Sequence, residues 1–429
     1  MLPIGQGHGK HDHNDQRGAS LTFGRHDESP TTPIEVTRMS NGVSIVASAH
    51  TPFGRLKDQT LEDLIASVAR DALRDGHIDA VEIDAVFLGH FNSGMVPDGF
   101  PASLVLQADK GLRFKPATRC ENACASGSAA IHAGINAIRS GAAKLVLVVG
   151  AEKMTANSTE HVTRALAGAG YQNDPHEASQ SFPQLFASAA EQYGGRYRDP
   201  MYDMARIAAK NHANALTNPL AQMHREMTVE HCNSVSDSNP IIASPLRLTD
   251  CSLISDGAAA IVLASADRAR DFSREVEIKA ATHVNDMLPV AGRDVLAFEG
   301  PQRAISSALQ HADLTLADID FAEVHDCFTI AELLIYEAMG LAPRGQGYKV
   351  LDEGTVYADG CLPVNLSGGL KAKGHPVGAT GVSMHALAFR QLTGAPIGVP
   401  AKGAEFGLVF NMGGMAVANY ASVLQARRS

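Results

Sequence analysis

Residues 120–150 have the sequence CENACASGSAAIHAGINAIRSGAAKLVLVVG, and this stretch decides the fold class. Small side chains run through its centre up to Gly141, a residue suited to the end of a helix. The apolar residues 145–149 that follow are typical of a strand buried on both faces, as in a parallel sheet covered by helices. A helix followed directly by such a strand predicts an α/β architecture.

Similar elements precede and follow this stretch. Residues 43–47 and 84–89 are short apolar runs that predict strands, and Thr60 precedes apolar positions at helical spacing that predict a helix. Residues 259–263 predict a further strand. Residues 155–244 lack such runs, and we interpret them as an inserted loop domain.

Residues 365–394, NLSGGLKAKGHPVGATGVSMHALAFRQLTG, repeat the pattern of the opening stretch. Both combine a small-residue turn, a reactive side chain, a helix that ends at a glycine and a following apolar strand. Glycine costs about 1 kcal/mol relative to alanine inside a helix, so we expect the two small-residue helices to lie side by side, where close approach compensates. The repeat predicts two related halves, residues 41–275 and 276–429, after a flexible extension at residues 1–40.

Composition narrows the function classes. The formal charge is 36 − 46 = −10, which argues against nucleic acid as the main partner, although Lys371 and Lys373 form a local cluster suited to a small anion. Six cysteines indicate reduced thiols rather than a disulfide framework. No apolar run approaches the roughly 20 residues of a membrane span, and the polar N-terminus lacks a signal-peptide core. We therefore expect a cytoplasmic protein, with His8, His11 and His13 solvated rather than bound to a metal.

Cys124 follows an extended segment and stands where the first small-residue helix begins. The unpaired N–H groups and the positive dipole end of a helix favour a thiolate, so the position predicts a lowered pKa and a nucleophile. Inert packing is the alternative for a single cysteine. A zinc pair with Cys120 is a third interpretation, but the C-x3-C spacing has no second pair nearby, and we expect no metal.

His375 lies in GHPVGATG at the start of the second small-residue helix. If a pseudo-twofold axis relates the halves, His375 and Cys124 occupy corresponding positions and face each other. A neutral imidazole beside a thiol can take its proton, which activates the sulfur. A histidine between a glycine and a proline also occurs as an ordinary loop residue, and the repeat is what favours the catalytic interpretation.

Two more motifs carry candidate residues. VHDCF, residues 324–328, ends a predicted strand, where α/β sheets place ligand-contacting residues. His325 and Cys327 are two positions apart, so on an extended chain both side chains point the same way, one to hold a water or an oxyanion and the other to move a proton. The alternative is Asp326 as a helix cap with Cys327 buried. In FNMGGMA, residues 410–416, the glycines would let backbone N–H groups approach a substrate oxygen.

Together, CENACASG, SDGAAA, VHDCF, NLSGGLKAKGHPVGATG and NMGG resemble the motifs of the thiolase family, in the family's order, over roughly residues 41–429. Within the family the chain is most similar to the sterol-carrier-protein-type branch, in which HDCF replaces the usual NEAF loop. The resemblance implies an α/β, five-layer αβαβα fold of two pseudo-repeated halves with an inserted loop domain. It also implies a homodimer or homotetramer, acyl-CoA and CoA as substrates, and no cofactor.

The resemblance implies roles for individual residues. Cys124 is similar to the acyl-accepting nucleophile, His375 to the histidine that activates it, and His325 to the residue that replaces the usual asparagine of the first oxyanion hole. Most thiolases carry a second catalytic cysteine in a C-x-G motif, and here residues 410–413 stand at that place without one. Cys327 resembles the cysteine that fills this role. The expected site residues are Cys124, His375, Cys327 and His325 for catalysis, Cys124, Met412 and Gly413 for the oxyanion, and Gly374, Ser367 and Gly368 for substrate binding.

These features predict an acyltransferase of the acetyl-CoA acetyltransferase or 3-ketoacyl-CoA thiolase type, which serves lipid metabolism by cleaving 3-oxoacyl-CoA with CoA or by condensing acyl-CoAs. One alternative is a decarboxylating, ketosynthase-like condensing enzyme. Another is a weakly active thiolase-fold subunit that binds CoA thioesters with a small OB-fold and zinc-binding partner protein, an interpretation motivated by the missing C-terminal cysteine.

Overall fold

The computed structural model of the 429-residue chain describes residues 42–427. The expected extension at residues 1–40, with its three histidines, lies outside the described residues. The strands are β1 Val43–His50, β2 Ala85–Gly89, β3 Ala117–Cys120, β4 Leu145–Glu152, β5 Ile241–Ala243, β6 Leu246–Arg247, β7 Gly257–Ser265, β8 Val276–Asn285, β9 Phe321–Val324, β10 Phe406–Gly413 and β11 Ala418–Ala426. The α-helices are α1 Leu61–Asp75, α2 Pro101–Leu104, α3 Ser126–Arg139, α4 Thr159–Ala167, α5 Pro175–Ala178, α6 Phe182–Arg196, α7 Met201–Ala215, α8 Val229–Asn233, α9 Ala266–Ala269, α10 Glu299–Ala312, α11 Thr329–Met339, α12 Tyr348–Asp352 and α13 Thr380–Leu392.

The first helix forms where its sequence predicts it. Thr60 caps α1 by accepting a hydrogen bond from the N–H of Asp63, and the Asp63 carboxylate accepts one from the N–H of Thr60 in return. Such a reciprocal pair satisfies two backbone donors that the first turn of a helix leaves unpaired. One face of α1 is buried, and Leu64, Ile65 and Val68 on it are at most 1% exposed. The helical spacing of the apolar residues therefore corresponds to a face packed against the sheet.

The strands reveal the internal repeat directly. Nine of the described strands form one sheet in the order β3-β2-β4-β7-β1-β8-β11-β10-β9. On either side of the β1–β8 contact the order is a mirror image, with β1, β7, β4 and β2 matched by β8, β11, β10 and β9. The pairing directions match as well, because β4 pairs parallel with β2 and antiparallel with β7, as β10 does with β9 and β11. The two pseudo-repeated halves predicted from the sequence are thus confirmed by topology.

The two halves meet along a short seam in the sheet. β1 and β8 pair antiparallel through Ser44 with Glu277 and Ile45 with Val276. The described structure gives no named counterpart of β3 in the second half, but Ala322 of β9 forms a parallel bridge to Val364, at the place where β2 pairs with β3. The second half therefore retains a trace of the outer strand.

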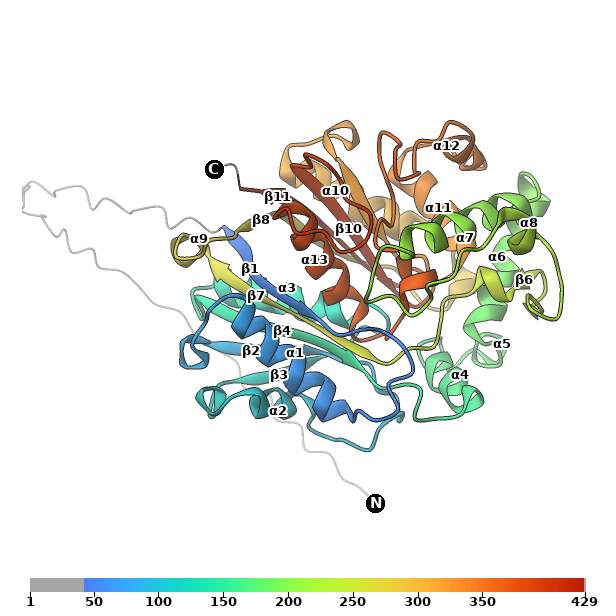
Figure 1. Cartoon of the computed structure of the whole chain (residues 1–429). Coiled ribbons are helices and arrows are strands. Elements are labelled where there is room, and N and C mark those ends of the chain that lie inside the picture. The colour runs from blue at the N-terminus through green and yellow to red at the C-terminus, as the bar shows by residue number, and fades with distance from the viewer. Residues whose placement is uncertain (1–41, 428–429) are drawn as a thin grey trace, which may run out of the picture. The chain divides into compact units, whose positions relative to one another are not determined.

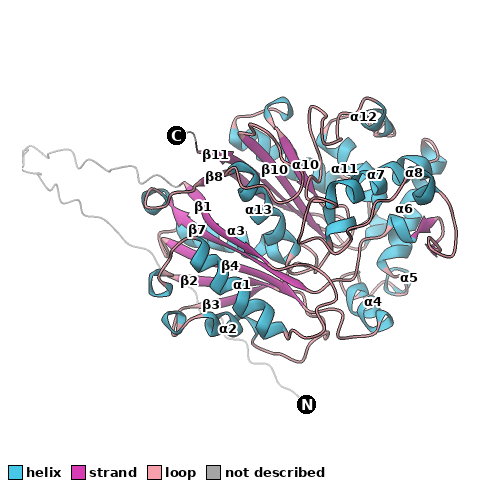
Figure 2. Cartoon of the chain, viewed as in Figure 1, coloured by secondary structure: helices cyan, strands magenta, loops and turns pink. Residues whose placement is uncertain are grey.

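The small-residue helices α3 and α13 lie side by side, as expected (Figure 1). A side chain at Gly127 of α3 would place its Cβ 2.8 Å from the backbone nitrogen of Val382 on α13, so only glycine permits this approach. α13 contacts β7 of the first half and β10 of the second, while α1 and α10 cover the outer faces. Figure 2 shows the helices on both faces of the strands. The layers are therefore helix, strand, helix, strand and helix, which confirms the predicted αβαβα fold.

Residues 155–244 contain helices α4–α8 and strand β5. Figure 1 shows α6, α7 and α8 beside α11, with α4 and α5 below them, and α7 packs against α11. Within residues 42–427, none of the helices combines the length and the apolar character needed to cross a bilayer.

Candidate active site

Cys124 lies in a tight turn just before α3, which begins at Ser126. The Ser126 hydroxyl accepts a hydrogen bond from the N–H of Asn122 at 2.9 Å and donates one to the carbonyl oxygen of Ala123 at 2.6 Å. Ala123 has a positive φ of 51°, which an alanine adopts only under constraint. The turn is therefore fixed by its own helix and presents a partly exposed Cys124.

His375 reaches the site from the other half of the chain. It follows a π-helical turn, Gly369–Lys373, and precedes α13, which begins at Thr380. Asp326 fixes this turn by accepting hydrogen bonds from the N–H groups of Leu370 and Lys371. Cys124 stands two residues before its helix and His375 five before its own, so the predicted equivalence of the two positions is wrong. The turn from His375 into α13 is three residues longer than the turn from Cys124 into α3.

The fold nevertheless brings the expected groups together. The Sγ atom of Cys124 and one ring nitrogen each of His325 and His375 lie within 4.8 Å of one another. The two imidazole rings meet edge to face with their centroids 5.1 Å apart. Cys124 comes from the first half of the chain and both histidines come from the second, so the cluster lies where the two halves meet.

The protonation of Cys124 differs from the prediction. Burial raises the pKa of the Cys124 thiol to about 12, although the N–H groups of Gly414 and of Cys124 itself oppose the shift. The predicted lowering of this pKa by the start of the helix is therefore wrong, because desolvation of the sulfur outweighs the nearby N–H groups. In the resting site the sulfur is a thiol and needs a base when it reacts.

His375 is arranged as such a base. Burial, helped by the charge of Lys373, lowers the pKa of His375 to about 3, so the ring is neutral. Its Nδ1 lies 2.7 Å from Oγ1 of Thr380, and that hydroxyl donates its own proton to the carbonyl oxygen of Pro376. Thr380 can then only accept from Nδ1–H, which leaves a lone pair on Nε2. The buried Nε2 has no partner among residues 42–427.

His325 and Cys327 do not share an extended strand as predicted. Strand β9 ends at Val324, and the N–H of Asp326 bonds back to the Val324 carbonyl, so the chain turns at His325. Nδ1 of His325 lies 2.8 Å from Nδ2 of Asn411, a residue of β10. Cys327 is 7% exposed and stands outside the Cys124–His325–His375 group. Burial raises the pKa of the Cys327 thiol, and the proximity of Cys124 raises it further.

The glycine turn after β10 approaches Cys124 and the turn that carries it. A Cβ on Gly413 would lie 2.2 Å from the carbonyl oxygen of Asn122, so this contact requires glycine. The N–H that contacts the Cys124 sulfur is that of Gly414, one residue beyond the predicted pair. Met412 and Gly413 pair with β11 in the sheet, and their contribution to an oxyanion hole stays a prediction. A pocket of about 570 Å³ opens beside this turn, and its lining includes Phe91, Asn92, Ala123, Leu288, Gly413 and Gly414.

The residues expected to bind substrate are buried near the second motif. The Ser367 hydroxyl donates to Glu323 at 2.6 Å, and Gly368, with a φ of 99°, packs against Ala215. Gly374, with a φ of 117°, would place a Cβ 2.9 Å from Oγ of Ser255. Substrate contact by these three residues stays a prediction.

Lys371 and Lys373 do not form the surface anion site that the sequence suggested. They are 3% and 1% exposed, and burial lowers the pKa of both amines. Lys373 donates to Oγ of Ser383 at 3.0 Å. Their place in a buried π-helical turn, rather than an exposed loop, is the physical reason for the correction.

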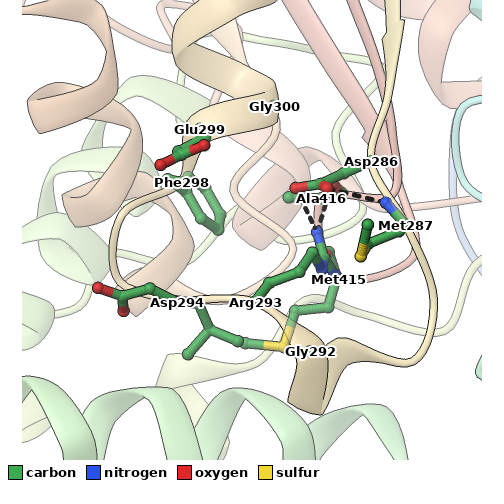
Figure 3. Close-up of a pocket in the computed structure, with 11 residues that line it drawn as sticks. Asp286, Met287, Gly292, Arg293, Asp294, Phe298, Glu299, Gly300, Met415 and Ala416 are labelled. Carbon is green, nitrogen blue, oxygen red and sulfur yellow. Dashed lines mark hydrogen bonds and ion pairs between the residues drawn. The ribbon is translucent and has the colours of Figure 1, made fainter.

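A second hollow, of about 300 Å³, lies beyond the glycine turn (Figure 3). Arg293 forms part of its wall and points to the turn, donating to the carbonyl oxygens of Met415 and Ala416 at 2.8 and 3.1 Å. It also pairs with Asp286 at 3.1 Å. Arg293 therefore stabilises the segment that follows Gly414 through these hydrogen bonds. No motif in the sequence predicts this contact.

Comparison with known proteins agrees with this geometry. The family model "Thiolase, N-terminal domain" matches residues 43–267, and "Thiolase C-terminal domain-like" matches residues 282–426. An acetyl-CoA acetyltransferase of Methanothermobacter thermautotrophicus is 36% identical over 374 residues, which cover 87% of this chain and 96% of that protein. Human sterol carrier protein 2 is 30% identical over 413 residues, which cover 90% of this chain and 71% of that protein.

Solved structures show the same fold. A chain of a structure described as Ltp2-ChsH2(DUF35) aldolase superposes with a TM-score of 0.75 at 21% identity, covering 91% of this chain and 99% of that chain. The chain thus belongs to the thiolase family, in the branch similar to sterol carrier protein 2 and the archaeal acetyl-CoA acetyltransferases. This membership makes it a thiolase-superfamily acyltransferase.

Proposed function

We propose that the protein cleaves 3-oxoacyl-CoA with CoA, or condenses acyl-CoAs in reverse, through a thioester on Cys124. The observation that carries the proposal is the convergence of the Cys124 sulfur and two imidazole nitrogens within 4.8 Å. The name of the archaeal relative, acetyl-CoA acetyltransferase, supports acetyl-CoA as one substrate.

Each step has a group suited to it. Nε2 of His375 takes the thiol proton as Cys124 attacks the C3 ketone, and the protonated ring then donates to the developing oxyanion. The C2–C3 bond breaks, the acyl group stays on sulfur, and Cys327 protonates the departing acetyl-CoA carbanion. The Cys327 thiolate then takes the proton of a second CoA thiol, whose sulfur attacks the thioester. Acyl-CoA leaves, and the His375 imidazolium returns its proton to the Cys124 sulfur, which regenerates the resting site. Division of the reaction at a covalent intermediate replaces one high barrier with two lower ones.

Intact-protein mass spectrometry after incubation with acetyl-CoA tests the central step. We expect an acetyl adduct on the wild type and on Cys361→Ala, whose altered thiol is exposed and outside the site. Cys124→Ala should carry no adduct while its circular dichroism spectrum is unchanged. An adduct of equal yield on Cys124→Ala would overturn the proposal. Thiolysis of 3-oxoacyl-CoAs of increasing length then defines the preferred chain.

A subunit that needs a partner protein is the second candidate. Asn411 stands in the N-x-G segment where most thiolases carry C-x-G, and the structural relative has a name that joins Ltp2 to ChsH2(DUF35). Strong turnover by the isolated chain would exclude this candidate. Turnover that appears only with a copurified partner would favour it.

A further inference from the structure

The side chain of Asn411 contacts three separate parts of the site: helix α3, the turn that carries Cys124, and the His325 ring. The Asn411 amide accepts a hydrogen bond from the Ser128 hydroxyl of α3 through Oδ1 at 2.8 Å. Its Nδ2 donates to the backbone carbonyl oxygen of Cys124 at 3.3 Å and lies 2.8 Å from Nδ1 of His325. Asn411 is fully buried, and each of these contacts crosses to another element. The Asn411 amide therefore connects the turn that carries Cys124 to the imidazole of His325.

The orientation of this amide follows from its neighbours. A backbone carbonyl oxygen only accepts hydrogen bonds, so the amide atom that faces the Cys124 carbonyl must be the nitrogen. The Ser128 hydroxyl then supplies a proton to Oδ1. Gly381 of α13 leaves room for this arrangement, because a Cβ there would lie 2.7 Å from Oδ1 of Asn411.

The amide orientation fixes the proton of His325. The amide nitrogen is a donor only, so Nδ1 of His325 accepts from it with its lone pair. His325 is 1% exposed, and burial, together with the neighbouring His375 ring and the charge of Lys373, lowers its pKa well below the ordinary value. The ring is therefore neutral and carries its single proton on Nε2, opposite to the arrangement in His375.

We infer that Asn411 is a positioning residue that holds His325 in the Nε2–H tautomer, so that His325 donates a hydrogen bond and offers no lone pair to a cation. Both nitrogens of His325 are then committed, Nδ1 to the amide and Nε2 to its proton. The catalytic consequence, a donor ready for an oxyanion, rests on the proposed function. The tautomer itself does not.

The second consequence concerns metals. A thiol and two imidazole nitrogens within 4.8 Å are a set that zinc can draw together, at Zn–S and Zn–N distances of ~2.3 and ~2.0–2.1 Å. A zinc ion on Cys124 would block the nucleophile. Because Asn411 withholds the His325 lone pairs, it removes one of three ligands and keeps the sulfur available.

The tautomer can be observed without any turnover. In protein labelled with ¹⁵N-histidine, the ring signals of His325 are assigned by comparison with His325→Ala. We expect Nδ1 unprotonated and Nε2 protonated in the wild type. In Asn411→Asp, the carboxylate can only accept from Nδ1–H, so Nδ1 should become protonated. A protonated Nδ1 in the wild type, or the same pattern in both proteins, overturns the inference.

Zinc binding gives an independent reading of the same change. A carboxylate behind a histidine ligand typically alters metal affinity 10–100-fold, so we expect Asn411→Asp to bind Zn²⁺ 10–100-fold more tightly than the wild type in competition with a chromophoric chelator. The matched control is Asn136→Asp, the same change at an exposed position of α3, which should bind as the wild type does. Wild-type affinity in Asn411→Asp contradicts the inference.

Asn411→Leu carries the test if the buried carboxylate prevents folding. It removes the amide donor without adding charge, so His325 should populate both tautomers and the ring signals should move toward an average. Ring signals identical to those of the wild type overturn the inference. A wild type that forms no acetyl adduct but shows the expected tautomer refutes the proposed function alone, so the two failures are distinguishable.

Discussion

Nδ1 of His375 donates to Oγ1 of Thr380 at 2.7 Å, and this bond selects the ring nitrogen that remains free to act as a base. The Thr380 hydroxyl has no proton left for the ring, since it donates to the Pro376 carbonyl at 3.0 Å. One residue of α13 thus sets both the tautomer and the orientation of the imidazole.

We therefore expect Thr380→Val to lower kcat about tenfold, or ~1.4 kcal/mol, the size of one net hydrogen bond, with little change in KM. Steady-state thiolysis kinetics measure the effect. Thr393→Val is the matched control, because among residues 42–427 that hydroxyl bonds to the carbonyl oxygens of Phe389 and Arg390 within α13 and to no imidazole. Equal kinetics for Thr380→Val and the wild type would show that the bond does not orient the base.

The raised pKa of Cys124 predicts a specific pH dependence of alkylation. Only the thiolate reacts, and a thiol with a pKa of about 12 is protonated throughout the physiological range. The rate of iodoacetamide modification at Cys124 should therefore rise about tenfold per pH unit from pH 7 to 10. Peptide mass spectrometry resolves Cys124 from the exposed Cys361, which serves as an internal reference. A plateau near pH 7 at Cys124 would instead indicate a resting thiolate.

Gly413→Ala should disable the site without unfolding the protein. The added Cβ would lie 2.2 Å from the Asn122 carbonyl, so the nucleophile turn must shift. Misplacement of a reacting group by about 1 Å can cost ~10²-fold in rate, and we expect a loss of that size in kcat/KM. Gly99→Ala, where nothing lies within 4 Å of the added Cβ, should retain wild-type kinetics. Full activity in Gly413→Ala would show that the turn carrying Cys124 can shift to accommodate the added Cβ without misplacing the sulfur.

Arg293→Met tests the connection behind the glycine turn. The change leaves the Met415 and Ala416 carbonyls without their guanidinium donor and Asp286 without its partner. Three partly buried interactions at about 1 kcal/mol each predict a loss of ~2–3 kcal/mol in the free energy of unfolding, measured by urea denaturation.

Arg196→Met is the comparison for this change. Arg196 pairs with Asp294 in the neighbouring loop, but both side chains are nearly half exposed, at 44% and 45%. Exposed pairs contribute ~0–1 kcal/mol, so we expect a small effect. Similar losses for the two variants would show that Arg293 acts as an ordinary surface charge.

The sequence predicts the elements because each carries a local signal. Thr60 is a typical N-cap residue and predicts the start of α1. The small residues around Gly127 predict that two helices pack closely. The internal repeat likewise predicts that Cys124 and His375 face each other. The structure does bring them together, although their positions relative to the two helices are not equivalent.

The remainder depends on contacts between distant segments. Asn411 lies within the FNMGGMA motif, but the role of its side chain follows only from its three partners in space. Burial of Lys373 and the high pKa of Cys124 also follow from packing, which no local pattern records. The sequence therefore identifies the candidate reacting groups, Cys124 and His375, but not the side chains that orient the two imidazoles, Asn411 and Thr380.

The seam between β1 and β8 joins the halves through only two residue pairs, while the reacting groups lie on opposite sides of that seam. Cys124 belongs to the first half, and His325 and His375 belong to the second. Acylation of Cys124 would therefore report on assembly of the fold, since the sulfur meets the imidazole of His375 only after both halves have folded and docked.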